Sequence, residues 1–238
     1  MTYVFGRAIK RFGFTMSEIL IAMTVLAIVV VLTIPFLVKN YQKEQFAQLT
    51  KQTFSILNNA KIKAEIDYGP MENWAIKNND TLDFINKYMK PYVIITKVNM
   101  NYDNHRTQFI DGAYFAQNAY DAFNYRTYKF YLQNGVQIAV KSCSIGGSDS
   151  DFCEVWADVN GPKKPNILGK DIHIFRYYFK PTYVHSKNLA GKFYVAHIFS
   201  ATGESLKTHC LNNSLNRAGA CTAVLLKNGW KYPNWFPW

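Results

Sequence analysis

The sequence predicts an α+β protein in which one long N-terminal helix packs on a C-terminal antiparallel β-sheet. Residues 19–38 form an apolar run of twenty residues without a charged side chain. Residues 41–66 then place apolar side chains three or four positions apart, which is typical of an amphipathic helix. Beyond residue 127, short runs rich in β-branched and aromatic residues alternate with turn signals, which indicates a sheet.

Composition excludes a disordered chain, because 49% of the 238 residues are apolar and only 18% are charged. The length allows one domain of moderate size plus an anchor. Aromatic residues reach 16%, which fits a β-rich head domain. The net charge of +11 arises from lysines and arginines scattered along the chain, and we interpret most of them as solvated surface.

The apolar run is long enough to cross a hydrocarbon core of about 30 Å as a helix. Arg7, Lys10 and Arg11 precede it, and basic residues on that side favour a cytoplasmic N-terminus with the rest of the chain outside. A cleaved secretory signal peptide would need a shorter apolar stretch and an A-x-A-like site after it. A plain single-pass anchor remains possible by length alone.

One helix is expected to continue from about Met16 to about Ile66, with Gly69-Pro70 ending it. Pro35 lacks a backbone N–H, so it either loosens this helix or ends the span at the membrane surface. The expected buried stripe of the second half is interrupted by a threonine and consists of Phe46, Leu49, Thr53, Ile56, Ala60 and Ala64.

Residues 13–18 read Gly-Phe-Thr-Met-Ser-Glu and stand immediately before the apolar run. This pattern resembles the class III signal of type IV pilins and type II secretion pseudopilins, and the resemblance extends over residues 7 to about 66. It implies a pilin-like fold with these parts: a leader peptide at 1–13, an N-terminal pilin helix at 14–66 that spans the membrane at about 14–38, and a globular head domain at 67–238.

The resemblance also implies roles for single residues. A prepilin peptidase would cleave between Gly13 and Phe14 and methylate the new amine of Phe14. Glu18 would pair with the Phe14 amine of a neighbouring subunit, which would offset the cost of placing a carboxylate in an apolar segment. Pro35 occupies the place of the helix-loosening proline of many pilins. Alternatively, Glu18 lies at the headgroup level and faces water.

In the head, Asn134-Gly135 predicts a two-residue type I′ hairpin turn between strands. Asp80 is a candidate N-cap for a short helix, on which Leu82, Ile85 and Met89 would share one face. The remaining expected elements are a helix at 81–89, a long loop at 99–125, strands at 128–132, 136–143, 153–159, 172–179 and 193–199, a helical turn at 222–227 and an aromatic tail at 230–238 that packs on the head.

The four cysteines form two close pairs in the second half of the chain. They contain no C-x-x-C motif and have no histidine at a metal-ligand spacing. Disulfides are therefore expected if the head lies outside the cytoplasm. Three pairings are possible, and proximity selects Cys143–Cys153 and Cys210–Cys221.

The loop at residues 158–171 holds four oxygen-bearing side chains, Asp158, Asn160, Asn166 and Asp171. They could bind Ca²⁺, and the loop resembles those of pilin-like proteins whose heads read D-V-N-G-P-x-x-P-N-x-x-G-x-D. The spacing is not that of an EF-hand, and two central lysines oppose a cation. We favour the alternative that these side chains cap the backbone of their own loop, and no other cofactor is expected.

The expected function is that of a filament subunit, a minor pilin or pseudopilin of a type IV pilus or type II secretion filament. It would reside in the bacterial inner membrane with its head outside, and its partners would be the prepilin peptidase and other subunits. The alternative is a DNA-binding or adhesive minor pilin of an uptake pilus, suggested by basic and aromatic residues at 126–129 and 176–178. An enzyme is not expected, because the five histidines form no H-E-x-x-H and neither G-x-S-x-G nor a P-loop occurs.

Overall fold

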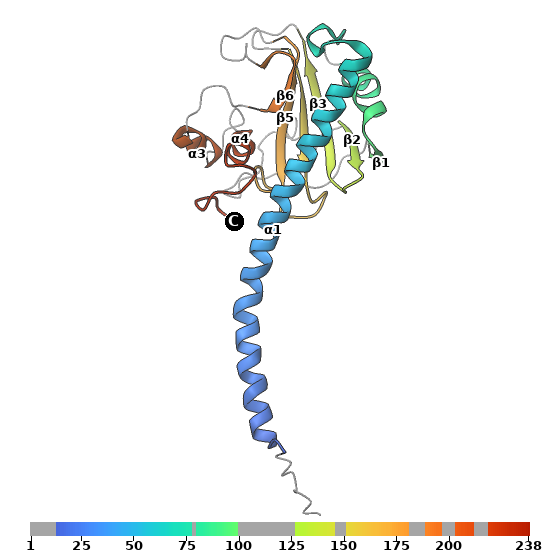
Figure 1. Cartoon of the computed structure of the whole chain (residues 1–238). Helices are drawn as coiled ribbons and strands as arrows, with labels where there is room; N and C mark the ends of the chain where they lie inside the picture. Colours follow the sequence, from blue (N-terminus) through green and yellow to red (C-terminus); the bar gives the residue numbers. More distant parts are fainter. Residues whose placement is uncertain are drawn as a thin grey trace, which may run out of the picture. The chain divides into compact units, whose positions relative to one another are not determined.

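The computed structural model of the chain describes residues 13–77, 80–99, 127–145, 151–180, 189–196, 203–211 and 219–238. The chain divides into two compact units, Met1–Gln42 and Lys43–Trp238, here called unit 1 and unit 2. Figure 1 shows the order of the elements. The helices are α1 (Met16–Tyr68), α2 (Thr81–Phe84), α3 (Gly203–Leu211) and α4 (Ala220–Lys227), and short helical turns occupy Met71–Asn73, Ile85–Met89 and Lys90–Tyr92. The strands are β1 (Ile95–Asn99), β2 (Tyr128–Leu132), β3 (Gln137–Ser144), β4 (Phe152–Asp158), β5 (Ile172–Tyr178) and β6 (Lys192–Val195).

Helix α1 confirms the predicted long helix and ends two residues later than expected. It continues through Pro35 and stops where Gly69 adopts a φ of 79° and donates its N–H to the Glu65 carbonyl. Glycine enters this left-handed conformation without steric cost, which explains the end of the helix.

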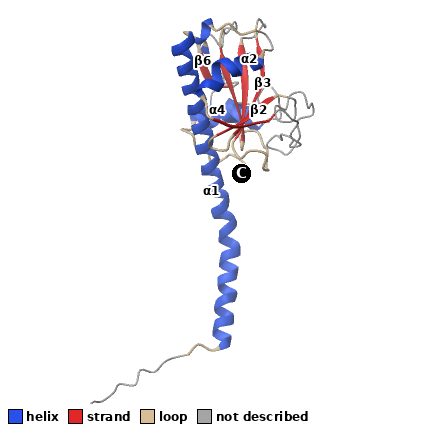
Figure 2. Ribbon diagram, turned by 90° about the vertical axis from the view of Figure 1, so that its right-hand side faces the viewer, coloured by secondary structure: helices blue, strands red, loops and turns tan. Residues whose placement is uncertain are grey.

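The second half of α1 lies within unit 2 and packs on one face of the sheet (Figure 2). Tyr177 of β5 donates its hydroxyl to the Leu57 carbonyl at 3.0 Å, and the ring of Phe54 lies 5.3 Å from that of Phe193 of β6. The buried residues are Phe46, Ala47, Thr50, Thr53, Leu57, Ala60 and Ala64.

This stripe corrects the predicted one. Leu49 and Ile56 are only half-buried at its margins, and Leu57 is fully buried instead. Thr53 does not break the stripe, because its hydroxyl donates to the Leu49 carbonyl at 2.8 Å. A threonine satisfied by its own helix is compatible with a buried position, so the predicted interruption was wrong.

The sheet has six strands in the order β1-β2-β3-β4-β5-β6, and every neighbouring pair is antiparallel. The antiparallel sheet was predicted, and the bounds of β2 match the expected ones. Strand β1 was not predicted. It lies at one edge of the sheet and follows the register of β2 with an irregularity between Ile95 and Lys97.

The turn between β2 and β3 is not the expected two-residue type I′ turn. Gly135 has a φ of 83°, whereas Asn134 is not among the residues with positive φ. Gly135 donates to the Leu132 carbonyl at 3.0 Å and Leu132 donates to the Val136 carbonyl at 2.9 Å. These bonds define a three-residue loop that ends in a left-handed glycine, the next commonest hairpin connection.

Both faces of β4 and β5 are buried. On the face away from α1, the Glu154 carboxylate lies 2.6 Å from an Arg176 nitrogen and accepts the Trp156 indole N–H at 2.8 Å. Burial alone would raise the pKa of Glu154, yet the charges of Arg176 and Lys141 hold the pKa down to about 2. The ion pair joins the adjacent strands β4 and β5 and places two opposite charges inside the fold.

The predicted helix at 81–89 forms as α2 followed by a π-helical turn, and Asp80 caps it by accepting the Asp83 N–H at 3.2 Å. Ile85 and Met89 are buried together, but Leu82 is half exposed, so its predicted place on their face was wrong. Phe84 and Tyr88, which lie four residues apart, are buried beside them.

The C-terminal part adds α3 and α4, and α4 begins two residues before the expected helical turn. Helix α3 was not predicted. The aromatic tail packs on unit 2 as expected, with Tyr232 and Phe236 buried. Most of the predicted loop at 99–125 and the end of the strand at 193–199 lie outside the described residues.

Candidate functional site

The N-terminal site candidates lie at the start of α1. Gly13 and Phe14 precede the helix, and Phe14 is exposed. Thr15 donates its backbone N–H and its hydroxyl to the Glu18 carboxylate, each at 2.8 Å. The Glu18 N–H in turn lies 3.3 Å from the Thr15 hydroxyl oxygen. This reciprocal pattern is a capping box, which satisfies donors at a helix N-terminus.

The capping box gives Glu18 a role that the sequence analysis missed. The T-x-x-E signature before an apolar run was present in the sequence and is sufficient to predict it. Glu18 therefore has a local partner within its own chain. A subunit contact through this carboxylate would have to exchange or share the bonds to Thr15.

The apolar segment of unit 1 is exposed along its whole length. None of the residues in its most apolar stretch of 18 is buried, and α1 is long and apolar enough to cross a membrane. Two threonines in it are satisfied by the helix itself: Thr24 donates to the Leu20 carbonyl and Thr33 to the Val29 carbonyl, each at 2.8 Å. Both threonine hydroxyls of the apolar segment thus have hydrogen-bond acceptors within the helix, as a lipid environment requires.

The loop at 158–171 gathers the four candidate calcium ligands. Asp171 accepts the Asn166 N–H at 2.7 Å and the Ile167 N–H at 2.5 Å, one on each carboxylate oxygen. Asp158 accepts the Asn160 N–H at 3.2 Å, and the Asn160 side-chain amide donates to the Lys164 carbonyl at 3.2 Å. The side chains therefore bind the backbone of their own loop.

This geometry favours the self-capping interpretation over the calcium site. Both Asp171 oxygens already accept N–H groups, and burial raises the pKa of Asp171 to about 6 although these bonds oppose the rise. Among the described residues, no group of three or more His, Cys, Asp or Glu side chains is placed to hold a metal ion. The Asn160 and Asn166 side-chain oxygens are buried without a hydrogen-bond partner, so calcium binding stays a prediction.

Both expected cysteine pairs form disulfides, Cys143–Cys153 across β3 and β4, and Cys210–Cys221 between α3 and α4. The second disulfide packs tightly on the loop at 158–171. A Cβ added at Gly169 would lie 2.1 Å from the Cβ of Cys221, so only glycine fits there.

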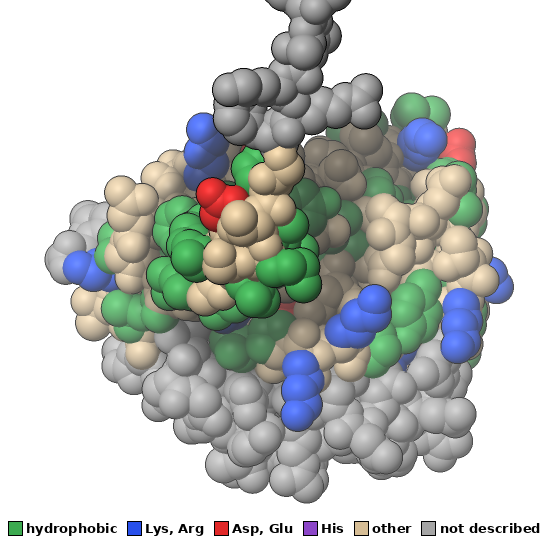
Figure 3. All heavy atoms as spheres, turned by 90° about the horizontal axis from the view of Figure 1, so that it is seen from below, with side chains coloured by type: hydrophobic (Ala, Val, Ile, Leu, Met, Phe, Trp, Pro, Cys, Tyr) green, Lys and Arg blue, Asp and Glu red, His purple; other side chains and the backbone are tan. Residues whose placement is uncertain are grey.

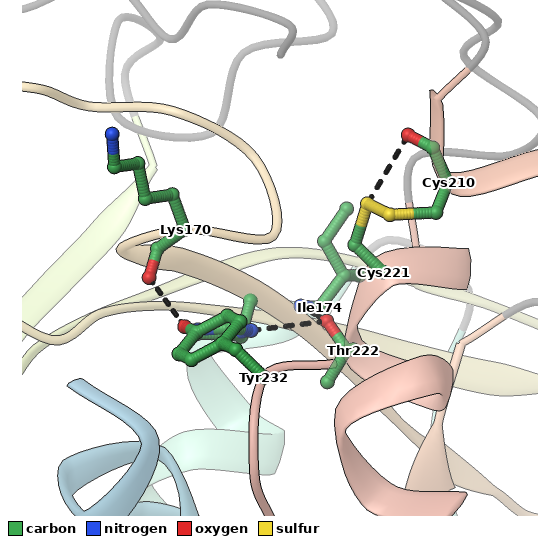
Figure 4. The surroundings of a disulfide bond; sticks show 7 residues. Lys170, Ile174, Cys210, Cys221, Thr222 and Tyr232 are labelled. Atoms are coloured by element: carbon green, nitrogen blue, oxygen red, sulfur yellow. Dashed lines mark hydrogen bonds between the residues drawn. A yellow bond between two sulfur atoms is a disulfide. The ribbon is translucent and has the colours of Figure 1, made fainter. Parts of the chain in front are cut away.

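Beside this disulfide lies a buried polar cluster that joins the loop, β5, α4 and the tail (Figure 4). Tyr232 donates its hydroxyl to the Lys170 carbonyl at 2.6 Å, and Thr222 accepts the Ile174 N–H at 3.2 Å. His173 is fully buried between them, 3.3 Å from the Thr222 hydroxyl and 3.4 Å from that of Tyr232. Burial lowers the pKa of His173 to about 3, so the imidazole is neutral.

A family model described as "Family of unknown function (DUF6613)" matches residues 36–238. The chain belongs to this family. The match covers unit 2 and the last residues of unit 1, so Gly13, Phe14, Glu18 and Pro35 lie before the matched range. No curated protein and no solved structure matches the chain.

Within the part that carries the DUF6613 match, most described residues of the basic and aromatic runs proposed for nucleic acid are buried, and Tyr128 and Arg176 are half-buried. Lys129 is fully buried, and Arg176 is tied to Glu154. Tyr177 and Tyr178 are also buried. The described side chains of these runs therefore offer little exposed charge or ring surface for stacking on bases, and binding of nucleic acid stays a prediction.

Proposed function

We propose that this chain is a filament subunit, a minor pilin or pseudopilin of the type IV pilus or type II secretion class. The observation that carries the proposal is the exposed apolar segment of α1, a helix that begins three residues after Gly13. Such a surface needs a non-aqueous environment. Lipid provides it while the subunit is anchored, and the helices of other copies provide it in a filament.

The arrangement of charge supports the proposed orientation. Three basic residues precede the span and favour a cytoplasmic N-terminus. Unit 2 then lies outside the bacterial inner membrane, and its two disulfides suit an oxidising compartment. We expect no enzymatic role for it.

Processing and assembly follow from the resemblance at residues 13–18. The prepilin peptidase cleaves between Gly13 and Phe14, which places a free, methylated amine one residue before the capping Thr15. In the filament this amine contacts Glu18 of a neighbour. The carboxylate has four acceptor positions, so it can accept the amine while keeping its bonds to Thr15.

The test is the intact mass and the N-terminal sequence of the protein from bacterial membranes that contain the prepilin peptidase. The expected chain begins at N-methyl-Phe14. The matched control is Gly13→Val, which keeps the apolar segment and is expected to leave the chain starting at Met1. A wild-type chain that still starts at Met1 under these conditions would refute the proposal and leave an ordinary tethered domain.

A further inference from the structure

The two disulfides hold unit 2 together in different ways. Cys143 and Cys153 face each other on β3 and β4, where backbone pairing on both sides already keeps the two strands together. Cys210 and Cys221 instead join the last turn of α3 to the first turn of α4 (Figure 4). The first bond repeats a contact that the sheet provides, whereas the second joins two helices that lie outside the sheet.

The two bonds also differ in what must open before a reagent reaches their sulfurs. Cys143 and Cys153 are 0% exposed, and two inner strands of the sheet would have to separate to uncover them. Cys210 and Cys221 are 6% and 3% exposed. Among the described elements, α3 packs mainly on α4, so opening of this one helix uncovers the second bond. Such local opening costs less free energy than separating strands in the core.

The start of α4 is the part that stays in place when α3 opens. Gly169 lies so close to Cys221 that a Cβ added to this glycine would come within 2.1 Å of the Cys221 Cβ. Thr222, the next residue, accepts the Ile174 N–H at 3.2 Å and so ties α4 to β5. Cys221 is therefore fixed on the loop and the sheet, and α3 carries the sulfur that moves.

The surroundings of the second bond favour a thiolate. Cys221 is the second residue of α4, and the positive end of a helix stabilises a negative charge. Lys207 stands three residues before Cys210 in α3, so the two side chains share a face of that helix. The chain has a net charge of +11, and few acidic side chains appear among the lysine and arginine side chains in Figure 3. A negatively charged thiolate reagent is therefore attracted to the chain.

We infer that Cys210–Cys221 is a thiol–disulfide exchange site for dithiols, whereas Cys143–Cys153 is inert towards them. A thiolate of the dithiol attacks the Cys210 sulfur, so that a mixed disulfide forms and Cys221 leaves as a thiolate. The second thiol, as its thiolate, then attacks the reagent's own sulfur in the mixed disulfide, which closes a disulfide within the reagent and releases the Cys210 thiolate. The two cysteine thiolates take up two protons, equal in number to those that the dithiol gave up.

The exchange releases α3 and leaves the sheet intact. The Lys207 ammonium lies 5.8 Å from the ring centre of Trp235 in the tail, so α3 also contacts the tail while the bond is closed. An oxidised dithiol reverses the reaction and closes the site again. The partner that fits is a small molecule or a protein with two thiols close together. The inference uses contacts within unit 2 alone and does not depend on the proposed filament role.

The first experiment measures how fast each bond is reduced in the wild-type chain. The full chain in detergent micelles is treated with dithiothreitol, free thiols are blocked with iodoacetamide at intervals, and peptide masses identify the labelled cysteines. We expect Cys210 and Cys221 to be labelled at least tenfold faster than Cys143 and Cys153. Equal rates for the two bonds, or faster reduction of Cys143–Cys153, would overturn the inference. This measurement needs no substitution, so it stands even where a variant fails to fold.

Limited digestion with trypsin then distinguishes release of α3 from unfolding. Lys207 reports on α3, and Lys129, which is fully buried in β2, reports on the sheet. The test variant combines Cys210→Ser with Cys221→Ser. Cleavage after Lys207 should rise at least fivefold in this variant and in the reduced wild type, while Lys129 stays protected.

The matched control combines Cys143→Ser with Cys153→Ser and should be cleaved like the wild type. Cleavage after Lys207 that stays unchanged once the second bond is reduced would show that α3 does not depend on this bond, and the inference would be wrong. Cleavage after Lys129 that rises together with cleavage after Lys207 would also contradict it, because the bond would then stabilise the whole of unit 2.

Discussion

Residues 16–42 and 43–68 belong to one helix, yet they meet their surroundings in opposite ways. The first part presents apolar side chains on every side and buries none of them within the chain. The second part buries one stripe against the sheet and keeps charged residues on its other faces. A helix that is apolar all round needs an apolar environment, whereas an amphipathic helix needs one only along a stripe.

The difference teaches where the stability of the two parts originates. The second part is stabilised by contacts within its own chain, such as those of Leu57 and Phe54. Among the described residues, none of the first part is buried by such contacts, and under the proposed function its partner is lipid or another subunit. Mutations in the two parts should therefore appear in different measurements.

The largest effect is expected from Leu57→Ala compared with Leu32→Ala. Leu57 is fully buried, whereas Leu32 is 72% exposed. Truncating a buried leucine removes its transfer free energy and leaves a cavity, which should lower the free energy of unfolding of unit 2 by about 2–5 kcal/mol. Urea unfolding of the full chain in detergent micelles, followed by tryptophan fluorescence, measures this. The same loss for Leu32→Ala would mean that the two parts are not energetically distinct.

A smaller effect, at least tenfold in filament yield, is expected from the charge of Glu18. Glutamine at this position retains the capping box with Thr15, so Glu18→Gln removes the charge and preserves the helix start. We expect its incorporation into filaments sheared from cells to fall at least tenfold. Glu18→Ala should fall as far and should also lose about 1 kcal/mol of helix stabilisation.

These two variants separate the roles of the carboxylate. If Glu18→Gln assembles like the wild type while Glu18→Ala does not, the capping box is the function of Glu18 and the pairing with the Phe14 amine is wrong. Helix content by circular dichroism in detergent is the control for both variants.

The smallest expected effect is a change with pH in the free energy of unfolding of unit 2. The folded-state pKa of His173, about 3, lies below the ordinary value of 6.5. As the pH falls, the unfolded state therefore binds a proton before the folded state does. The stability that depends on a neutral His173 is lost as the pH falls from 6.5 towards 3. Asp171 acts in the opposite direction, because its pKa is raised from 3.8 to about 6, so its contribution to stability grows as the pH falls from 6 to 3.8.

His173→Gln removes only the first of these two contributions. The wild type should lose about 2 kcal/mol of stability relative to the variant between pH 7 and pH 5, because the histidine gains a proton in the unfolded state and stays neutral in the folded state. Urea titrations of both proteins at the two pH values measure this difference. A difference that does not change with pH would show that His173 titrates normally in the folded chain.

The sequence was most informative where a single local rule decides the outcome. The length of α1, the strand Tyr128–Leu132 and the Asp80 cap follow from periodicity, β propensity and capping chemistry. Residues 158–171 were recognised as one loop of polar side chains, and the cysteines were paired by proximity. In these cases the interacting groups are close in sequence.

Predictions failed where contacts distant in sequence decide the outcome. Leu57 is buried in place of Ile56 because it lies on the helix face that packs on the sheet, where Tyr177, 120 positions later, donates its hydroxyl to the Leu57 carbonyl. The turn at Gly135 depends on how β2 and β3 meet, which the Asn-Gly pair alone does not specify. Strand β1 was missed because it is an edge strand with mostly exposed side chains.

The order of the strands has a consequence for synthesis. Each strand of the sheet pairs with the one made just before it, and the two disulfides join cysteines only 10 and 11 residues apart. Contacts between segments near in sequence form with little loss of chain entropy. The second half of α1, which precedes all six strands, is available from the start as the surface on which they collect. The sheet can therefore be assembled in the order in which its chain emerges, and the C-terminal tail, with Tyr232 and Phe236, completes the core last.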